Sequence, residues 1–454
     1  MLFLIHHKSI KYIILILCLV VGTSLTTMKI YGQDNQTMEQ SSLTTISDDS
    51  LLLTNSPSFS YSYSSHSPIE ITDDLDFTSA NGVVSGSGVE EDPFIIEGWK
   101  IDASESHGIY ISQTTKYFNI QKNFISAEGS SPTSAIYIEN VMSGTAKIEN
   151  NDCQDKPNGI FLYNSSNNFL TNNSCTNCHF GICVEESSNN NLLSNYCSYN
   201  CIGIYFKGLS NGNNATNNIC NSNDWEGIKT QNYTFLKNNT CNFNTGKGIY
   251  VHGSHNYLIN NHCLNGYYGI SLYFSDLNKI INNTCTLNKR DGISIRCSHN
   301  NVLINNNCSK NNNGIHLTYS DNNILSRNLL VGNSYGINLS LISKANLVYH
   351  NTFIDNNRLS QAYDDVRCSI YNEDKNNVWY NTVSNEGNFW SDYSGSGDYL
   401  IAGSANSIDP YPLDENGVPY PNTSEDNHKN VDFYPFTLML LILGSSVRKR
   451  KYNI

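Results

Sequence analysis

Short runs in which apolar and polar residues alternate return along most of the chain. Each run opens with a small residue, usually glycine, followed by isoleucine, a variable residue and a further residue that is usually apolar. Alternation with a period of two is typical of a β-strand with one buried face, so the isoleucine and the residue two positions later are predicted to point inward. Eleven of these runs begin at Gly108, Ala135, Gly159, Gly181, Gly203, Gly227, Gly248, Gly269, Gly292, Gly314 and Gly336.

A second recurring element, such as Leu-Ile-Asn-Asn-Asn-Cys, lies between these runs and predicts two columns of stacked side chains. The first column is asparagine: Asn151, Asn173, Asn195, Asn218, Asn239, Asn261, Asn283, Asn306, Asn328 and Asn351. The second lies two residues further on and is cysteine, then apolar: Cys153, Cys175, Cys197, Cys220, Cys241, Cys263, Cys285, Cys308, Leu330 and Phe353.

The repeating unit of about 22 residues has no helical period and cannot bury its apolar face alone. Stacking each unit on the last, with parallel strand pairing about 4.8 Å apart, buries that face. The sequence therefore predicts an all-β solenoid, a parallel β-helix of about 11 coils. Stacked asparagines can link their amides from coil to coil, and asparagine also tolerates the left-handed conformation that corners need.

The cysteine column has three interpretations. A buried thiol behaves as a small apolar side chain, which favours a reduced ladder in the core. Occasional disulfides are an alternative for an exported chain, although parallel stacking keeps the Cβ atoms too far apart without strain. A ladder that binds a soft metal is the third.

The two ends differ from the repeats. Lys8 and Lys11 precede an apolar run from Tyr12 to Gly22, the layout of a secretory signal, with an uncleaved anchor as the alternative. We expect a signal peptide over 1–33, a flexible polar linker over 34–67, the repeat domain over 68–385 and a capping segment over 386–432. Residues 433–454 join a short apolar stretch to a basic end, which predicts a membrane anchor or a processed sorting tail; the alternative is a last buried strand.

Charge and motifs exclude several functions. The 454-residue chain has a net charge of -13 and 15% charged residues, and it lacks the clustered basic face of a nucleic-acid binder. No nucleophile motif, metal-spaced His and Asp cluster or phosphate-binding loop stands out, so no cofactor and no metal are predicted.

If inward positions build the core, function is expected on the outward ones. Aromatic rings there suit stacking on sugar rings, whereas the alternative is that they only stabilise the exposed sheet. The predicted substrate-binding residues are Tyr110, Tyr137, Phe161, Tyr163, Tyr205, Tyr250 and Tyr273.

Catalytic candidates on the same face are Glu139, Glu185 and Arg296. The two glutamates lie two coils apart, so their backbones are about 9 to 10 Å apart, near the upper limit for an inverting glycosidase pair. Tyr163 between them would crowd a reacting sugar. Arg296 with Asp291, and His252 with His316, are further candidate sets.

Two end segments carry a family resemblance. Ser85 to Ile101 and Glu386 to Leu413, with the coils between them, resemble the NosD-type group of the pectin-lyase-like superfamily. The resemblance implies a right-handed parallel β-helix capped at both ends, with Trp99 and Trp390 covering the core. Phe94 follows Asp92-Pro93, so the Asp-Pro-His-Glu motif of related epimerases is missing, and Asp364-Asp365 is expected to follow the regular coils in an irregular insertion.

The sequence thus predicts an exported, surface-tethered β-helix that binds a polysaccharide or cell-envelope glycan, extracellularly or at the cell surface, through its exposed strands. A polysaccharide lyase, hydrolase or epimerase that uses the same groove is the second interpretation. A stalk or adhesin without catalysis is the third.

Overall fold

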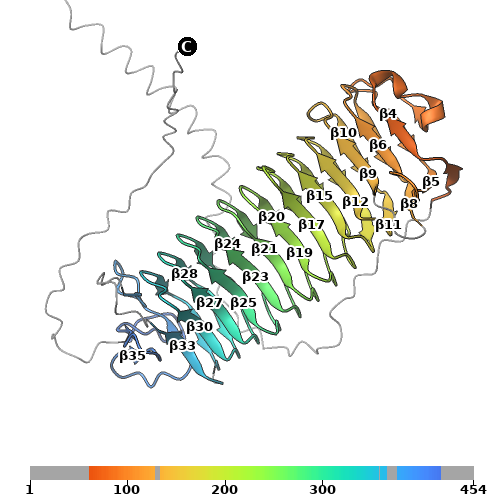
Figure 1. Ribbon diagram of the computed structural model, residues 1–454. Helices are drawn as coiled ribbons and strands as arrows, with labels where there is room; N and C mark the ends of the chain where they lie inside the picture. Colours follow the sequence, from red (N-terminus) through yellow and green to blue (C-terminus); the bar gives the residue numbers. More distant parts are fainter. Residues whose placement is uncertain (1–60, 128–132, 357, 366–375, 421–454) are drawn as a thin grey trace, which may run out of the picture. The chain divides into compact units, whose positions relative to one another are not determined.

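The computed structural model describes residues 61–127, 133–356, 358–365 and 376–420, which form a β-solenoid (Figure 1). The predicted signal peptide, most of the linker and the apolar tail lie outside the described residues. Within the described part the strands form two sheets of 13 strands, shorter sheets of five and three strands on a third side, and a final two-stranded pair, and almost every pairing is parallel.

The sheet of the Gly-Ile runs has 13 strands in strict chain order, and its outward surface is called the strand face below. Its strands are β2 (Ile69–Ile71), β6 (Ile109–Ser112), β9 (Ser134–Glu139), β12 (Asn158–Tyr163), β15 (Phe180–Glu185), β17 (Ile202–Lys207), β19 (Glu226–Thr230), β21 (Lys247–Val251), β23 (Tyr268–Tyr273), β25 (Asp291–Arg296), β27 (Asn313–Thr318), β30 (Tyr335–Ser340) and β33 (Ser360–Asp364).

A second sheet of 13 strands carries the short apolar element of each coil. Its strands are β3 (Val83–Ser85), β4 (Phe94–Glu97), β7 (Phe118–Gln121), β10 (Ala146–Glu149), β13 (Phe169–Thr171), β16 (Asn191–Leu193), β18 (Asn214–Thr216), β20 (Phe235–Lys237), β22 (Tyr257–Ile259), β24 (Lys279–Ile281), β26 (Val302–Ile304), β28 (Ile324–Ser326) and β31 (Leu347–Tyr349). Only the first pair, β3 with β4, is antiparallel.

The third side of the coil holds strands only near the two ends. They are β1 (Ser64–His66), β5 (Trp99–Asp102), β8 (Phe124–Ser126), β11 (Asp152–Gln154) and β14 (Ser174–Thr176), then β29 (Leu329–Val331), β32 (Thr352–Ile354) and β34 (Phe389–Trp390). Single parallel bridges connect the coils between them. The pair β35 (Tyr399–Leu400) and β36 (Ile408–Asp409) follows, and two 3-10 turns, Asp74–Asp76 and Ser79–Asn81, lie near the start.

The core has the predicted composition. The isoleucines of the Gly-Ile runs and the residues two positions later are buried, for example Ile293 and Ile295. The eight column cysteines, from Cys153 to Cys308, are buried free thiols. Burial raises the pKa of the Cys175 and Cys197 thiols well above the usual range, so these thiols stay protonated and apolar.

The predicted asparagine column is a continuous hydrogen-bond ladder. Each Nδ2 donates to the Oδ1 of the next coil's asparagine at 2.9–3.0 Å, as from Asn261 to Asn283 and from Asn283 to Asn306. The ladder is longer than predicted, because it begins at Asn123 and continues through Asn351 to Asn388. Its last Nδ2 faces the buried carboxylate of Asp409 at 3.2 Å.

The residue before each ladder asparagine supplies the corner. From the residue before Asn151 to the residue before Asn351, and including Asn260, Asn282 and Asn305, φ lies between 54° and 58°. Asparagine adopts this left-handed conformation more readily than most residues. The doubled asparagines of the sequence therefore divide two tasks: the first turns the chain and the second links the coils.

Two further ladders were not predicted. One runs through Asn256, Asn278, Asn301, Asn323, Asn346 and Asn377 to Asp364. The other runs through Asn288, Asn311, Asn333 and Asn356 to Gln361. Each ladder thus ends on a buried side chain that accepts its last amide hydrogen.

Two expectations about segment limits differ from the structure. Ser64–His66 pairs with β5, so the last residues of the expected linker are a strand of the solenoid. Asp364 was expected in an irregular insertion, but it ends β33, which pairs with β30, and it is 1% exposed. It accepts hydrogen bonds from Trp379 Nε1 and Ser407 Oγ, because the side chain points into the end of the core.

The end caps contain the expected tryptophans. Trp390 is buried and stacks between Phe353 and Tyr399, with ring centroids 4.1 Å away on each side. Trp99 packs partly buried against the other end of the core, and its Nε1 donates to Gly82 O at 2.8 Å. Trp379, also buried, was not predicted to cover the core.

Candidate functional site

The predicted outward columns of the strand face exist in the predicted register. Tyr137 pairs with Phe161, Phe161 with Cys183 and Cys183 with Tyr205. The second column brings Glu139, Tyr163 and Glu185 next to one another in the same way. Side chains about 22 residues apart in the chain are therefore lateral neighbours on one surface.

The aromatic side chains at the start of this face stack on each other. The rings of Tyr137 and Phe161 are 4.9 Å apart with an interplanar angle of 7°, and Tyr110 lies 5.3 Å from Tyr137. Tyr163 lies 6.3 Å from Phe161. Because neighbouring rings already cover much of these ring faces, they offer a ligand mainly their edges and hydroxyl groups.

Cations cover the rings further along the face. Lys229 Nζ lies 4.5 Å from the ring centroid of Tyr205, and Lys247 Nζ lies 4.5 Å from that of Tyr250. The guanidinium of Arg296 lies 5.7 Å from the ring of Tyr273. All seven predicted substrate-binding side chains are thus half-buried on one face, each packed against a ring or a cation.

The two candidate catalytic glutamates are already paired with neighbours. Glu139 Oε2 accepts a hydrogen bond from the Tyr110 hydroxyl at 2.7 Å, and burial together with the Glu139 carboxylate raises the pKa of Tyr137. Glu185 forms an ion pair of 2.9 Å with Lys207. Tyr163 lies between the two glutamates, as expected, and separates them.

The other two candidate sets, Arg296 with Asp291 and His252 with His316, are not paired as predicted. Asp291 is 1% exposed and contacts His316 at 3.2 Å, whereas Arg296 stacks on Tyr273. His252 lies between the rings of Tyr250 and Tyr273, 6.3 and 6.0 Å away. The structure therefore pairs Asp291 with His316 and leaves His252 in the aromatic row.

Sequence reasoning missed a third outward column and the edge beside it. The column is the residue before each glycine and includes Glu226, which forms a 3.0 Å ion pair with Lys247. The edge is one residue earlier, where Trp225 is 56% exposed and Tyr267 is 41% exposed. Strict alternation, continued backwards from the inward isoleucine, would place this column on the core side; the glycine and the isoleucine are both buried, so the alternation breaks there and the column faces outward.

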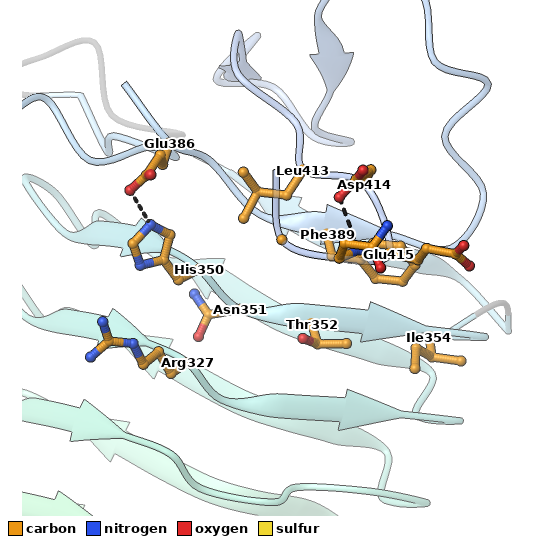
Figure 2. Close-up of a pocket in the computed structure, with 12 residues that line it drawn as sticks. Arg327, His350, Asn351, Thr352, Ile354, Glu386, Phe389, Leu413, Asp414 and Glu415 are labelled. Carbon is orange, nitrogen blue, oxygen red and sulfur yellow. Dashed lines mark hydrogen bonds and ion pairs between the residues drawn. The ribbon is translucent and has the colours of Figure 1, made fainter. Parts of the chain in front are cut away.

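An open pocket of about 730 Å³ lies away from the predicted residues, at the C-terminal end of the third side (Figure 2). His350 and Glu386 form an ion pair of 2.8 Å at one end of it. Ile354, Phe389 and Leu413 contribute its apolar lining, and residues 414–417 also line it. The hydrogen bond from Ser384 and the contact with His350 lower the pKa of Glu386.

In the described ranges, no three His, Cys, Asp or Glu side chains are grouped to hold a metal ion. No helix in that part of the chain is long and apolar enough to span a bilayer.

Comparisons with known proteins define the class. Residues 128–262 match the family model described as right handed beta helix region, and the chain is a right-handed parallel β-helix protein. Residues 236–395 match the model described as periplasmic copper-binding protein (NosD), so the resemblance to NosD-type β-helix proteins is confirmed. No curated protein sequence matches the chain.

Solved structures resemble the chain at low sequence identity. The A-module of mannuronan C-5 epimerase AlgE4 from Azotobacter vinelandii is 13% identical with a TM-score of 0.51, covering 64% of this chain and 98% of that module. The AlgE6 A-module from the same organism is 11% identical with a TM-score of 0.46, covering 70% of this chain and 90% of that module. The periplasmic alginate epimerase AlgG is 15% identical with a TM-score of 0.40, covering 70% and 84%. At this identity the likeness extends to the fold alone.

Proposed function

We propose that the protein is an exported β-helix protein that binds a polysaccharide along its strand face. The observation that carries the proposal is the exposed aromatic pair Trp225 and Tyr267 at the edge of this face. Gly246 occupies the same position in the coil between them, which leaves no side chain there. Two coils separate backbones by about 9.6 Å, so a chain of sugars can lie on one ring, cross the glycine and reach the other.

In this proposal the predicted tyrosines do not provide ring faces on which sugars stack. Their ring faces are largely covered, so they contribute hydroxyl groups and ring edges beside the exposed pair. Tyr205 and Tyr250 lie under Lys229, which adds a cationic donor at the middle of the face. Hydroxyl and ammonium donors next to exposed rings are the groups that recognise sugar hydroxyls.

Binding fits these residues better than glycoside cleavage. A glycosidase needs one carboxyl group to act as an acid and a second to act as a base or nucleophile. Glu139 is hydrogen-bonded to Tyr110, Glu185 is paired with Lys207, and Tyr163 fills the space between them. Structures that share the fold include epimerases named for mannuronan and alginate, which agrees with a carbohydrate-related role.

Export and surface attachment complete the proposal. They rest on the secretory layout of residues 1–33 and on the apolar and basic segment 433–454. The family model that matches residues 236–395 is described as periplasmic, which agrees with export.

The test is binding of the full chain to immobilised neutral and acidic polysaccharides, for wild type and a Trp225→Ala/Tyr267→Ala variant. Tyr257→Ala is the matched control, since Tyr257 is also 41% exposed but lies on the second sheet. We expect saturable binding, at least tenfold weaker in the double variant and unchanged in the control. No binding by wild type to any glycan would leave the stalk interpretation, and new reducing or unsaturated ends would indicate a polysaccharide-cleaving enzyme.

A further inference from the structure

Three side chains on the strand face form a chain of contacts that the proposed glycan binding does not use. His316 on β27 places Nδ1 3.2 Å from Asp291 Oδ2 on β25 and Nε2 3.0 Å from Ser340 Oγ on β30. Asp291 is 1% exposed, whereas the His316 side chain is 18% exposed and Ser340 is half-buried. The acid lies deepest, and the other two side chains are partly exposed.

The acid is held from a second side. Asn313 Nδ2 donates to Asp291 Oδ1 at 2.6 Å, and Asn338 Nδ2 donates to Asn313 Oδ1 at 3.2 Å. One carboxylate oxygen is therefore fixed by the amide, and the other faces the imidazole. With the ring proton on Nδ1, the imidazole donates to Asp291, and its free Nε2 can accept the hydrogen of Ser340, whose Oγ also lies 3.4 Å from Leu317 O.

This order of contacts is the arrangement that activates a serine hydroxyl. A carboxylate orients the imidazole and stabilises its charged form, and the imidazole removes the proton of the hydroxyl as it attacks. We propose that Asp291, His316 and Ser340 form an ester-hydrolysing site, with Ser340 as nucleophile, His316 as general base and acid, and Asp291 as the group that orients His316.

The reaction runs in two balanced steps. Ser340 Oγ attacks the ester carbonyl carbon while its proton passes to His316 Nε2; the bond to the alcohol oxygen then breaks, and that oxygen takes the proton from His316. Water next attacks the acyl-serine, giving its proton to His316, which returns it to Ser340 Oγ as the carboxylic acid leaves. One water is consumed, and one alcohol and one acid are formed.

Thr318 is the neighbouring group best placed to assist. Its hydroxyl is 3.2 Å from His316 Nε2 and 3.5 Å from Ser340 Oγ, because Thr318 and Ser340 are register partners on adjacent strands. A donor at this position can contact the carbonyl oxygen as negative charge develops there. Thr318→Val is therefore expected to lower kcat more than it changes KM.

The surroundings indicate the class of ester. The three residues lie on an outward sheet surface shared with the exposed aromatic pair, and the pocket of Figure 2 is lined by other residues. An open surface suits a short acyl group carried by a polymer. The substrate class we infer is an O-acylated polysaccharide; this part of the inference rests on the proposed glycan binding, whereas the triad itself does not.

The experiment uses the full chain and two readouts. The first is hydrolysis of p-nitrophenyl acetate by wild type and by the Ser340→Ala, His316→Gln and Asp291→Asn variants, with Ser271→Ala as control. Ser271 is an outward serine two coils before His316. We expect losses of about a hundredfold or more for the first two variants, a smaller loss for Asp291→Asn and none for the control.

The second readout is labelling of wild type by a fluorophosphonate, with the modified residue located by mass spectrometry. Modification at Ser340 supports the site even if the Ser340→Ala variant folds poorly. Equal hydrolysis by wild type and Ser340→Ala, or no modification of Ser340, would overturn the inference.

The two proposals fail separately. Hydrolysis of the small ester without glycan binding would support the triad and remove the polysaccharide proposal. Glycan binding without a labelled Ser340 would support the polysaccharide proposal and remove the triad. Release of acetate from an acetylated glycan, lost in Ser340→Ala while binding persists, would support both.

Discussion

Asn388 Nδ2 donates to Asp409 Oδ2 at 3.2 Å, and this contact places a carboxylate at the end of twelve linked amides. Every amide in the ladder donates toward the C-terminal end, so the partial positive charges of the N–H groups point that way. The same oxygen accepts hydrogen bonds from the backbone N–H of Asn388 at 2.7 Å and from Trp390 Nε1 at 2.9 Å. Asp409 thus caps the ladder as an acidic residue caps a helix N-terminus.

Removing this cap should destabilise the C-terminal coils. Asp409→Ala leaves the buried backbone N–H of Asn388 and the Nε1–H of Trp390 without acceptors, each at a cost of about 1 to 3 kcal/mol. We expect a loss of about 3 kcal/mol or more in the free energy of unfolding, measured by chemical denaturation. The exposed Asp92→Asn substitution is the control, and a loss equal to that of the control would contradict the capping role.

Stability should also depend on the protonation of Asp409. Burial raises the pKa of this carboxyl from its ordinary value near 3.8 to about 6. Because the folded pKa lies above the unfolded one, the protonated form favours folding, and this contribution is present below about pH 4 and is lost as pH rises to about 6. The loss is about 3 kcal/mol for a shift of this size.

The contribution of Asp409 protonation to the free energy of unfolding is isolated by denaturing wild type and Asp409→Asn at intervals from pH 4 to 7. The amide does not titrate, so wild type should lose stability relative to the variant across this range. Parallel pH profiles for the two proteins would show that Asp409 does not titrate differently in the folded state.

Two adjacent asparagines should respond differently to the same substitution. Asn283 accepts from Asn261 and donates to Asn306 and to Leu258 O, so Asn283→Ala leaves several buried groups unpaired, at a cost of about 3 kcal/mol. Asn282 is exposed with φ 57°, and alanine there costs only about 1 kcal/mol of backbone strain. Thermal unfolding of both variants measures this difference; equal losses would refute the division of tasks.

The cysteines of the core column should resist alkylation in the native protein. Cys201 and Cys297 are partly exposed, so iodoacetamide should label them first, whereas Cys241, Cys263 and Cys285 should react only after unfolding. Peptide mapping before and after denaturation without reductant measures this. Column cysteines that stay unlabelled in the denatured protein would indicate disulfides instead of a reduced ladder.

The fold was predictable because its signals are local and repeated. The alternation around Ile293 identifies a strand, and the recurrence of Asn283 and Cys285 in successive units identifies the stacking. The second ladder, which includes Asn278 and Asn301, was not predicted, because asparagine is frequent throughout the repeats and this column does not stand out among the others. Asp364 was misplaced because it lies after the last clear repeat. Trp225 and Tyr267 were not predicted because they lie before the glycines, outside the alternating runs.

The sequence by itself determined the coil, its inward and outward residues and the register of neighbouring strands, since these follow from a period of two within a longer repeat. Only the tertiary structure decided which outward groups meet. Asp291, His316 and Ser340 are about one coil apart along the chain, and whether they touch depends on side-chain direction across three strands. Ring stacking and ion pairing on the strand face depend on the same side-chain directions, which the repeat pattern does not specify.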